Sequence, residues 1–485
     1  MKHCSNSHCP GQQQGDKPLE YHDSEELCPA CGSRLTATDQ VVHQPSSPPW
    51  KRFFVTVGIV AVYLGATKIA LPTVTPTPAF GEGPRVARSI MELGVRPLLS
   101  GYLLVELAAL LVPVWRPLRM GRPEGRAKLQ RASLLVGMLL ALFQAVVLAI
   151  WLEKMGAATD PGSGFRIITV IALVGATAAL VVLARIGDRE GLGSGFSILL
   201  LAAAGPDIIG PLRNAYTAAQ AGAIPTSALY NGAFSVAVLV GATLWLFSPY
   251  CLPGAEPLDH PSLVSRPACG MAPLSVVPAV LMVATISTRL SNPGQAFGPQ
   301  SAGYFATALA LSIPAALLFA FLFNPPDRIA EMWRSLSQNA GEAIPRLKAV
   351  MLESVLFIAL VMLVQAWVVR SVGAVFVPIA TKIIIATGIL CDLTREWHAR
   401  RTNPHLTSIW EIHQSYAVAP SLRLLKAEGI HAFAKGMHLR ALLQFFGPYI
   451  PVQILVPVED ARRANAFMQA RWPGGDGRDG SLGKA

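Results

Sequence analysis

The sequence predicts an all-α, polytopic membrane protein of about ten transmembrane helices, with a small polar region at each end. Three observations predict this class. Hydrophobic residues make up 52% of the 485 residues and charged residues only 14%, whereas soluble domains average ~25% charged residues. The apolar residues gather in long runs, and a run of ~20 residues is enough to cross a bilayer core of ~30 Å. Short charged segments separate the runs.

Ten segments are candidates to span a membrane, and each is expected to be a helix because lipid offers no partner for open backbone groups. The fifth segment is short and contains Gly205-Pro206, which makes it the weakest of the ten. The candidates are residues 53–71, 97–115, 132–152, 165–184, 195–211, 229–249, 272–290, 304–323, 351–370 and 375–393.

Basic residues are concentrated in alternate loops between these segments. Lys51 and Arg52 precede the first segment, a basic cluster occupies residues 116–131, and Arg395, Arg400 and Arg401 follow the last segment. Because basic residues stay on the cytoplasmic side, the distribution predicts that both termini are cytoplasmic. The same distribution accounts for the net charge of +11, so no direct role with nucleic acid is expected.

The polar N-terminus is expected to hold a metal in residues 1–35, followed by a linker at 36–50. Cys28-Pro-Ala-Cys31 is followed by Gly32, which permits a close backbone turn, whereas the earlier cysteine pair is more widely spaced and His3 or His8 could substitute. Four thiolates on two turns suit tetrahedral Zn²⁺. The alternative, reactive thiols or a disulfide, is disfavoured in the cytoplasm. The predicted zinc ligands are Cys4, Cys9, Cys28 and Cys31.

Beyond the membrane domain, which is expected at 51–401, the hydropathy falls. Residues 402–470 predict a small α+β domain with strands at 410–416, 431–434 and 452–456. A helix at 420–428 is expected to end at Gly429, and acidic residues 459 and 460 suit the start of another helix. Residues 471–485 are rich in glycine and predict a disordered tail.

Short motifs follow one another through the apolar region. They are Leu71-Pro-Thr-Val74, Met91-Glu-Leu-Gly-Val-Arg-Pro97, Gly125-Arg-Ala-Lys-Leu-Gln-Arg131, Asp188-Arg-Glu-Gly-Leu-Gly-Ser-Gly-Phe-Ser197, Val276-Val-Pro-Ala-Val280 and Ile389-Leu-Cys-Asp392. In this order they resemble the SecY family, the channel subunit of the bacterial protein-export translocon. The resemblance covers about residues 50–401. It implies two inverted five-helix halves in the bacterial plasma membrane, a plan common among transport proteins.

The resemblance also implies a site and partners. An apolar constriction can block ions without charge because it dewets. Expected partners are SecE-like and SecG-like small subunits, the SecA motor or the ribosome, and unfolded secretory polypeptides. Arg346 matches the motor-facing loop. The residues that match the family's pore ring are Leu99, Leu103, Phe196, Leu200, Val280 and Ile385.

Three departures from the family support an alternative, a specialised SecY relative with narrow substrates or a scaffold role. The segment from 72 to 94 is short for a plug helix, the loop at 251–270 has Arg266 as its one basic residue, and Ser194 stands where the family usually has Asn. A small-solute carrier is disfavoured because the spans lack a polar midplane site. Charged residues within the spans are few, and they include Lys68, Glu106, Arg370 and Lys382.

No phosphate loop or nucleophile elbow occurs in the sequence, so no enzymatic activity is expected. The motifs Leu425-Lys-Ala-Glu-Gly-Ile430 and Val452-Gln-Ile-Leu-Val-Pro-Val-Glu-Asp-Ala461 of the C-terminal domain resemble a small family described as signal-transducing. That resemblance favours a docking or sensing role for the domain. The alternative is a soluble cap without a ligand.

Overall fold

The computed structural model divides the chain into two compact units, Met1–Ser46 and Ser47–Ala485. The structure describes residues 48–72, 74, 89–115, 118, 123–251, 302–323, 356–357, 359–364, 367, 377–413, 417–443 and 450–471, and in the first unit 2–4, 20–21 and 35–37. The seventh predicted span, 272–290, lies outside the described residues, and the ninth, 351–370, is described only in part.

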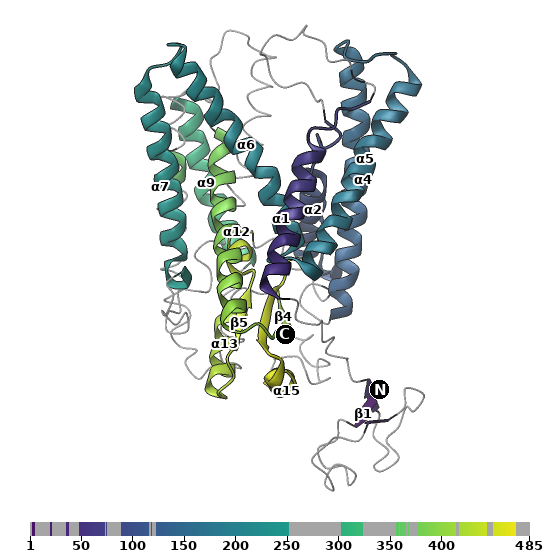
Figure 1. Ribbon diagram of the computed structural model, residues 1–485, viewed down its shortest axis with the longest axis vertical. Coiled ribbons are helices and arrows are strands. Elements are labelled where there is room, and N and C mark those ends of the chain that lie inside the picture. Colours follow the sequence, from purple (N-terminus) through teal and green to yellow (C-terminus); the bar gives the residue numbers. More distant parts are fainter. Residues whose placement is uncertain are drawn as a thin grey trace. The chain divides into compact units, whose positions relative to one another are not determined.

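Helices dominate the second unit, as expected (Figure 1). Four of the described segments are long and apolar enough to cross a membrane: Ala127–Lys154, Ser163–Glu190, Gly195–Gln220 and Thr226–Trp245. The long helices are α1 (Pro49–Ala66), α2 (Arg96–Leu111), α4 (Pro123–Lys154), α5 (Ser163–Glu190), α6 (Gly195–Gln220), α7 (Thr226–Cys251), α9 (Ala302–Phe323) and α12 (Val377–Thr402).

Helix α6 is nine residues longer than its predicted span, which ended at 211 rather than 220. Pro206 and Pro211 lie inside it. Each proline removes one backbone hydrogen-bond donor. Proline is tolerated in membrane helices because neighbouring helices and local adjustments satisfy the freed backbone groups. The helix begins with Ser194 as its N-cap, whose side chain accepts a hydrogen bond from the backbone N–H of Ser197 at 3.2 Å. Serine and asparagine cap helices about equally well, so the exchange at this position preserves the cap.

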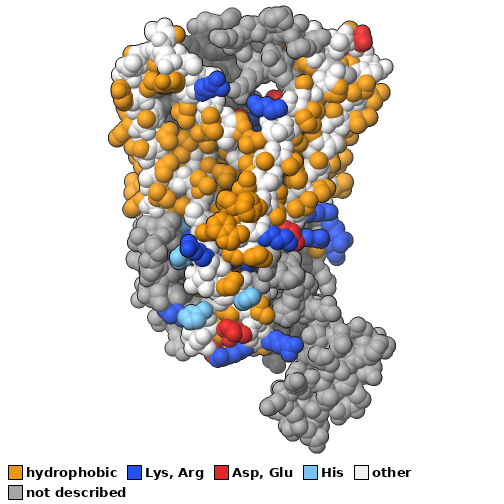
Figure 2. Space-filling view, in the orientation of Figure 1, with side chains coloured by type: hydrophobic (Ala, Val, Ile, Leu, Met, Phe, Trp, Pro, Cys, Tyr) orange, Lys and Arg blue, Asp and Glu red, His pale blue; other side chains and the backbone are white. Residues whose placement is uncertain are grey.

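Small residues bring helices α2 and α4 into backbone contact. A Cβ added to Gly101 of α2 would lie 2.5 Å from the backbone nitrogen of Gly137 in α4. Such close approach through small residues is typical of helix pairs in membranes. On the face shown in Figure 2, hydrophobic side chains cover a broad band of the described helices, while charged side chains lie toward the two ends of this band and the histidines lie at its lower end. This pattern fits a surface that meets lipid.

The C-terminal residues form an antiparallel sheet with strand order β4-β6-β5, from β4 (Leu406–Ile412), β5 (Phe433–Lys435) and β6 (Val452–Pro457). Helices α13 (Val418–Ala427) and α15 (Ala461–Arg471) pack with the sheet around a core that includes Ile412, Leu425 and Ile454. We call residues 406–471 the C-terminal domain. The domain contains both helices and strands, although β4 begins four residues before the predicted strand at 410–416. Gly429 has the positive φ, +74°, that suits the end of α13. One short helix, α14 (Met437–Leu442), was not predicted.

The first unit contains a small antiparallel sheet with strand order β2-β1-β3. Its strands are β1 (Lys2–Cys4), β2 (Glu20–Tyr21) and β3 (Leu35–Ala37). Cys4 lies directly opposite Leu35 in this sheet. The other predicted zinc ligands, Cys9, Cys28 and Cys31, lie outside the described residues.

Candidate functional site: an apolar cluster and the polar junction beside it

Five of the six predicted ring residues lie in or against one hydrophobic cluster. Phe196 and Leu200, from α6, are buried members of this cluster. Leu99 and Leu103 of α2 and Ile385 of α12 are partly buried and pack against it. The cluster therefore brings together three helices that are far apart in the sequence. Val280, the sixth residue, and Arg346 of the predicted motor-facing loop lie outside the described residues.

Helices α2 and α6 meet within this cluster through aromatic side chains. The rings of Tyr102 and Phe196 pack edge to face with their centroids 5.4 Å apart. Tyr102 is adjacent to Leu103 in the sequence, and Leu104 on the following position is half exposed. The helix therefore presents Leu103 toward the cluster and Leu104 away from it, which provides a matched pair of positions for experiments.

Two polar contacts tie α6 to α12 on either side of the apolar residues. The backbone N–H of Gly193, just before α6, donates to Oε2 of Glu396 at 2.6 Å. Asp207 follows Gly193 by fourteen residues, and it pairs with Lys382, which precedes Glu396 by fourteen residues. The two helices therefore run antiparallel, and Leu200 and Ile385 lie between the contacts. At 1.5 Å per residue the contacts are about 20 Å apart.

The ion pair of Asp207 and Lys382 was missed by the sequence analysis. The Lys382 ammonium lies 2.5 Å from Oδ2 of Asp207, and the two side chains are 29% and 36% exposed. Lys382 was recognised in the sequence as a charge within a predicted span, but Asp207 was not. An acidic residue next to Pro206, inside an apolar span, was the available signal. Charges within a membrane span are expensive unless they are paired or face a water-filled cavity.

Neutralising one partner of this pair is expected to destabilise the protein. Asp207→Asn or Lys382→Met leaves a charge without its partner, and we expect a loss of about 1 kcal/mol because the pair is only partly buried. The exchanged double variant Asp207→Lys/Lys382→Asp should recover most of the loss. Thermal unfolding of the detergent-purified variants measures both effects. A double variant that is as unstable as the sum of the singles would contradict a direct pairing.

The turn between α5 and α6 requires glycine for two separate reasons. Gly193 has a φ of +71°, in the left-handed region that other residues rarely adopt. Gly195 faces α5 so closely that an added Cβ would overlap the carbonyl oxygen of Ala184. Asp188 at the end of α5 accepts a hydrogen bond from the backbone N–H of Gly195 at 2.7 Å. These contacts explain Gly193 and Gly195 in the motif from 188 to 197.

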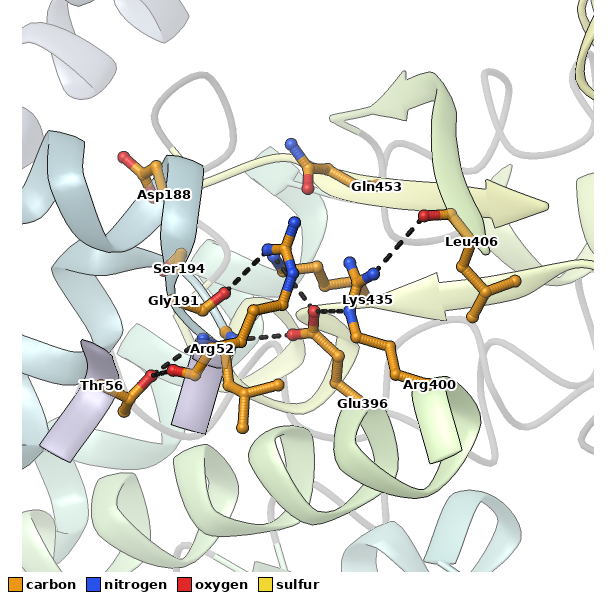
Figure 3. Close-up of polar contacts among 12 residues, drawn as sticks. Arg52, Thr56, Asp188, Gly191, Ser194, Glu396, Arg400, Leu406, Lys435 and Gln453 are labelled. Carbon is orange, nitrogen blue, oxygen red and sulfur yellow. Dashed lines mark hydrogen bonds and ion pairs between the residues drawn. The ribbon is translucent and has the colours of Figure 1, made fainter. Parts of the chain in front are cut away.

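Three parts of the chain surround this turn and form with it what we call the polar junction (Figure 3). Its members are Arg52 and Thr56 from α1, the turn residues 191–195, Glu396 and Arg400 from α12, and Lys435 from β5. Arg52 Nη1 donates to the carbonyl of Gly191 at 3.0 Å, and the backbone N–H of Leu192 donates to Oγ1 of Thr56 at 2.8 Å.

Glu396 is the central residue of the polar junction. Its carboxylate accepts from Arg400 Nε at 2.8 Å and lies 3.4 Å from the Lys435 ammonium. The three side chains are almost completely buried, with Glu396 only 1% exposed. A buried carboxylate is stable only when it is paired and hydrogen-bonded, and here one backbone N–H and two cations satisfy it. Sequence analysis placed Arg400 among the cytoplasmic basic residues and did not identify Glu396 or Lys435.

The electrostatics of the junction favour the charged form of Glu396. Burial alone would raise the pKa of this carboxyl, but the charges of Lys435 and Arg400, with the hydrogen bond from Gly193, hold its pKa below the ordinary value of 4.5. Burial lowers the pKa of Lys435, and the nearby cations Arg400 and Arg52 lower it further, against the opposing effect of Glu396. Removing Glu396 would therefore leave an excess of buried positive charge.

A second contact set fixes the C-terminal domain against the helices. Asp392 of α12 accepts from the backbone N–H groups of His438 and Leu439 at 3.0 and 2.9 Å, and its Oδ1 lies 2.7 Å from Nδ1 of His438. The His438 ring packs edge-on against Phe247 of α7, with centroids 4.8 Å apart. The C-terminal domain is thus anchored at α12 and α7 as well as at the polar junction.

These observations define a class of protein: a multi-pass helical membrane protein whose helices α2, α6 and α12 share an apolar cluster. Comparison with known proteins supports the SecY family for part of the chain. The model of the SecY family matches residues 89–251. This range begins at the residue that pairs with Ala70 and ends with α7, so it contains α2 and α6 with four of the predicted ring residues.

Individual relatives match over a similar length. The protein translocase subunit SecY of Escherichia coli (strain K12) is 28% identical over 127 residues, which are 25% of this chain and 29% of the relative. SecY of Synechococcus elongatus is 29% identical over 122 residues, 25% of this chain and 27% of the relative. The matched segment thus spans less than a third of these relatives' own length.

The solved structures that are similar include one described as the structure of a protein conducting channel. It aligns with a TM-score of 0.48 and 14% identity, covering 74% of this chain and 94% of the other. A second is Sec61 in the canine ribosome-channel complex, with a TM-score of 0.47.

Proposed function

We propose that this chain is the channel subunit of a Sec-type translocon, which moves unfolded polypeptides across the bacterial plasma membrane and releases apolar segments into it. The observation that carries the proposal is the packing of Leu99, Leu103, Phe196, Leu200 and Ile385 around one apolar cluster. Four of these five residues lie in the range that matches the SecY family. An apolar waist of this kind lets an extended chain pass but resists ions.

The proposal includes the arrangement and partners that the resemblance implies. Ten helices would form two inverted halves with both termini in the cytoplasm. SecE-like and SecG-like subunits would bind the helices. SecA or the ribosome would dock at the loop that contains Arg346 and supply the polypeptide. The family match at 89–251 favours this general role over a specialised relative with narrow substrates or a scaffold role.

Widening the apolar waist is expected to open an ion leak. Leu103→Gly removes a side chain that packs against the cluster, and a wider constriction wets more easily. Leu104→Gly makes the same change on the neighbouring residue, which is half exposed. In planar bilayers with the purified protein, the unmodified protein and Leu104→Gly should be nearly silent, whereas Leu103→Gly should conduct. Equal conductance of the two variants would argue against a pore at this cluster.

We further propose that the N-terminal unit binds zinc through Cys4, Cys9, Cys28 and Cys31. The sheet register supports this ligand set. Cys4 pairs with Leu35, which is four residues after Cys31, so the chain returns to Cys4 shortly after the second cysteine pair. Thiolates are the ligands that structural zinc prefers. Among the described residues no group of three metal-binding side chains is found, and of the four cysteines these residues include only Cys4.

The zinc proposal predicts about one Zn²⁺ per chain in the purified protein, as in a tetrahedral four-cysteine site. Elemental analysis by mass spectrometry measures the content. Cys28→Ser/Cys31→Ser should abolish it, whereas Cys251→Ser/Cys269→Ser, at the scattered cysteines, should leave it unchanged. A zinc content that survives the first double variant would contradict the assignment.

A further inference from the structure

We propose that the C-terminal domain positions the start of α6, and with it Phe196 and Leu200, through the contact of Lys435 with Glu396. The two are positioning residues in this account, because neither is part of the apolar cluster. The coupling itself does not depend on transport. Its consequence for a channel, that the state of the domain alters the waist, rests on the proposed function.

The turn that leads into α6 is rich in glycine. Three of the five residues from 191 to 195 are glycine, and Gly193 occupies the left-handed region. Glycine gives the backbone the greatest conformational freedom, so the position of the turn depends on its external contacts. Its hydrogen bonds to other elements come from Arg52 and Thr56 on α1, from Asp188 on α5 and from Glu396 on α12. Phe196 follows Gly193 by three residues, so a displaced turn moves it directly.

Glu396 in turn depends on the C-terminal domain for its partners. Its partner Lys435 lies on β5 of that domain. Arg400, the other cation, is itself bonded to the domain, because its Nη1 donates to the carbonyl of Leu406 at 3.4 Å. Displacing the domain would therefore remove one partner of Glu396, release a restraint on the other, and uncover a carboxylate that is now buried. Hydrated by water, that carboxylate no longer needs the N–H of Gly193.

The C-terminal domain is held closely against α12 near Glu396. Asp392 binds the backbone of His438 and Leu439, so α14 and α12 are held together one turn before Glu396. A Cβ added to Gly388 in α12 would lie 2.6 Å from Leu442 of α14. The domain and the end of α12 thus contact one another closely, and movement of one is passed to the other. Any partner that binds the domain and shifts β5 would be sensed at α6.

The test measures the accessibility of position 200 in the full-length protein in membranes. Leu200→Cys is introduced, a membrane-permeable maleimide is added, and mass spectrometry gives the alkylation rate at this position. The rate is compared in the parent, with Lys435→Met, with the conservative Lys435→Arg, and with Arg463→Met. Arg463 is an exposed cation of the same domain that pairs with Glu428, so its variant loses the same charge away from the junction.

We expect Lys435→Met to raise the rate at least about fivefold, the lower end of typical coupling between sites. Lys435→Arg and Arg463→Met should stay near the parent rate. Limited proteolysis after Thr402 reports whether the domain has been released. If Lys435→Met leaves the rate at position 200 unchanged, whether or not the domain is released, the coupling is wrong. An equal rise with Arg463→Met would also overturn it. Because alkylation needs no transported polypeptide, this result is independent of the test of the channel.

Discussion

Glu396→Gln is expected to destabilise the protein by about 3–5 kcal/mol, the usual cost of removing one partner from a buried ion pair. The side chain is 1% exposed and is surrounded by Arg400, Lys435 and Arg52. Glutamine has nearly the same shape, so the loss comes from the missing charge rather than from a cavity. Thermal or denaturant unfolding of the detergent-purified protein measures the change.

The control for this variant is Glu428→Gln, the same substitution in the C-terminal domain. Glu428 is 42% exposed and lies 3.7 Å from Arg463, and exposed pairs of this kind contribute ~0–1 kcal/mol. The unfolding midpoint of Glu428→Gln should therefore stay close to that of the unmodified protein. If Glu396→Gln is as mild as Glu428→Gln, the polar junction does not stabilise the fold.

Acid provides an independent check on the same residue. Because the pKa of Glu396 in the folded protein lies below its unfolded value of about 4.5, the unfolded state takes up a proton first as the pH falls. The stabilisation by this carboxylate is therefore complete above pH 4.5 and is lost as the pH falls toward the folded pKa. The charged groups that interact with Glu396 are Lys435, Arg400 and Arg52, and Asp188 interacts with Lys435. As the pH falls through this range, the thermal unfolding midpoint of the unmodified protein should decrease more steeply than that of Glu396→Gln.

Gly195→Ala is expected to be the second severe substitution. The new methyl group would overlap the carbonyl oxygen of Ala184 and approach its Cα within 2.8 Å. These atoms are backbone of α5, so they cannot rotate away as a side chain would. Overpacking of this kind costs typically 1–3 kcal/mol, and more when the backbone must shift. The start of α6 would also move away from α5.

Gly205→Ala is the matched control, because it makes the same change ten residues later in the same helix, where an added Cβ meets no atom within 4 Å. Alanine favours helix by up to ~1 kcal/mol over glycine, so this variant should be neutral or slightly stabilising. The unfolding midpoints of Gly195→Ala and Gly205→Ala measure the difference in stability between the two variants. A mild Gly195→Ala would mean that α5 and α6 are less closely packed than the structure has them.

The helices were predictable from the sequence to the extent that their apolar runs were long. The fifth predicted span ended at 211, whereas the helix continues through Pro206 and Pro211 to Gln220. Helix α14 was missed because it has only six residues and is stabilised at its start by Asp392, which is 46 residues away in the sequence. A local pattern carries no information on such a distant cap.

The candidate site was predictable only in its apolar part. Leu99, Leu103, Phe196, Leu200 and Ile385 were identified through the family resemblance, and their roles as ring residues remain predictions. The contact of Gly193 with Glu396 joins residues 203 positions apart, and that of Asp207 with Lys382 joins residues 175 apart. Such pairs depend on how the helices pack, which one sequence does not reveal. The glycines at 191, 193 and 195 were the visible signal that the turn is closely packed.

The proposed channel function is tested most directly by asking whether a polypeptide in transit touches the apolar cluster. A secretory chain is stalled on the ribosome in membranes that contain the protein with a photo-reactive probe on Leu200→Cys or, as control, on Ile209→Cys. Leu200 is 8% exposed and Ile209 is 64% exposed on the same helix. The account predicts strong crosslinks from position 200 and weak ones from 209. Crosslinks from 209 alone, or from neither position in an intact complex, would contradict it.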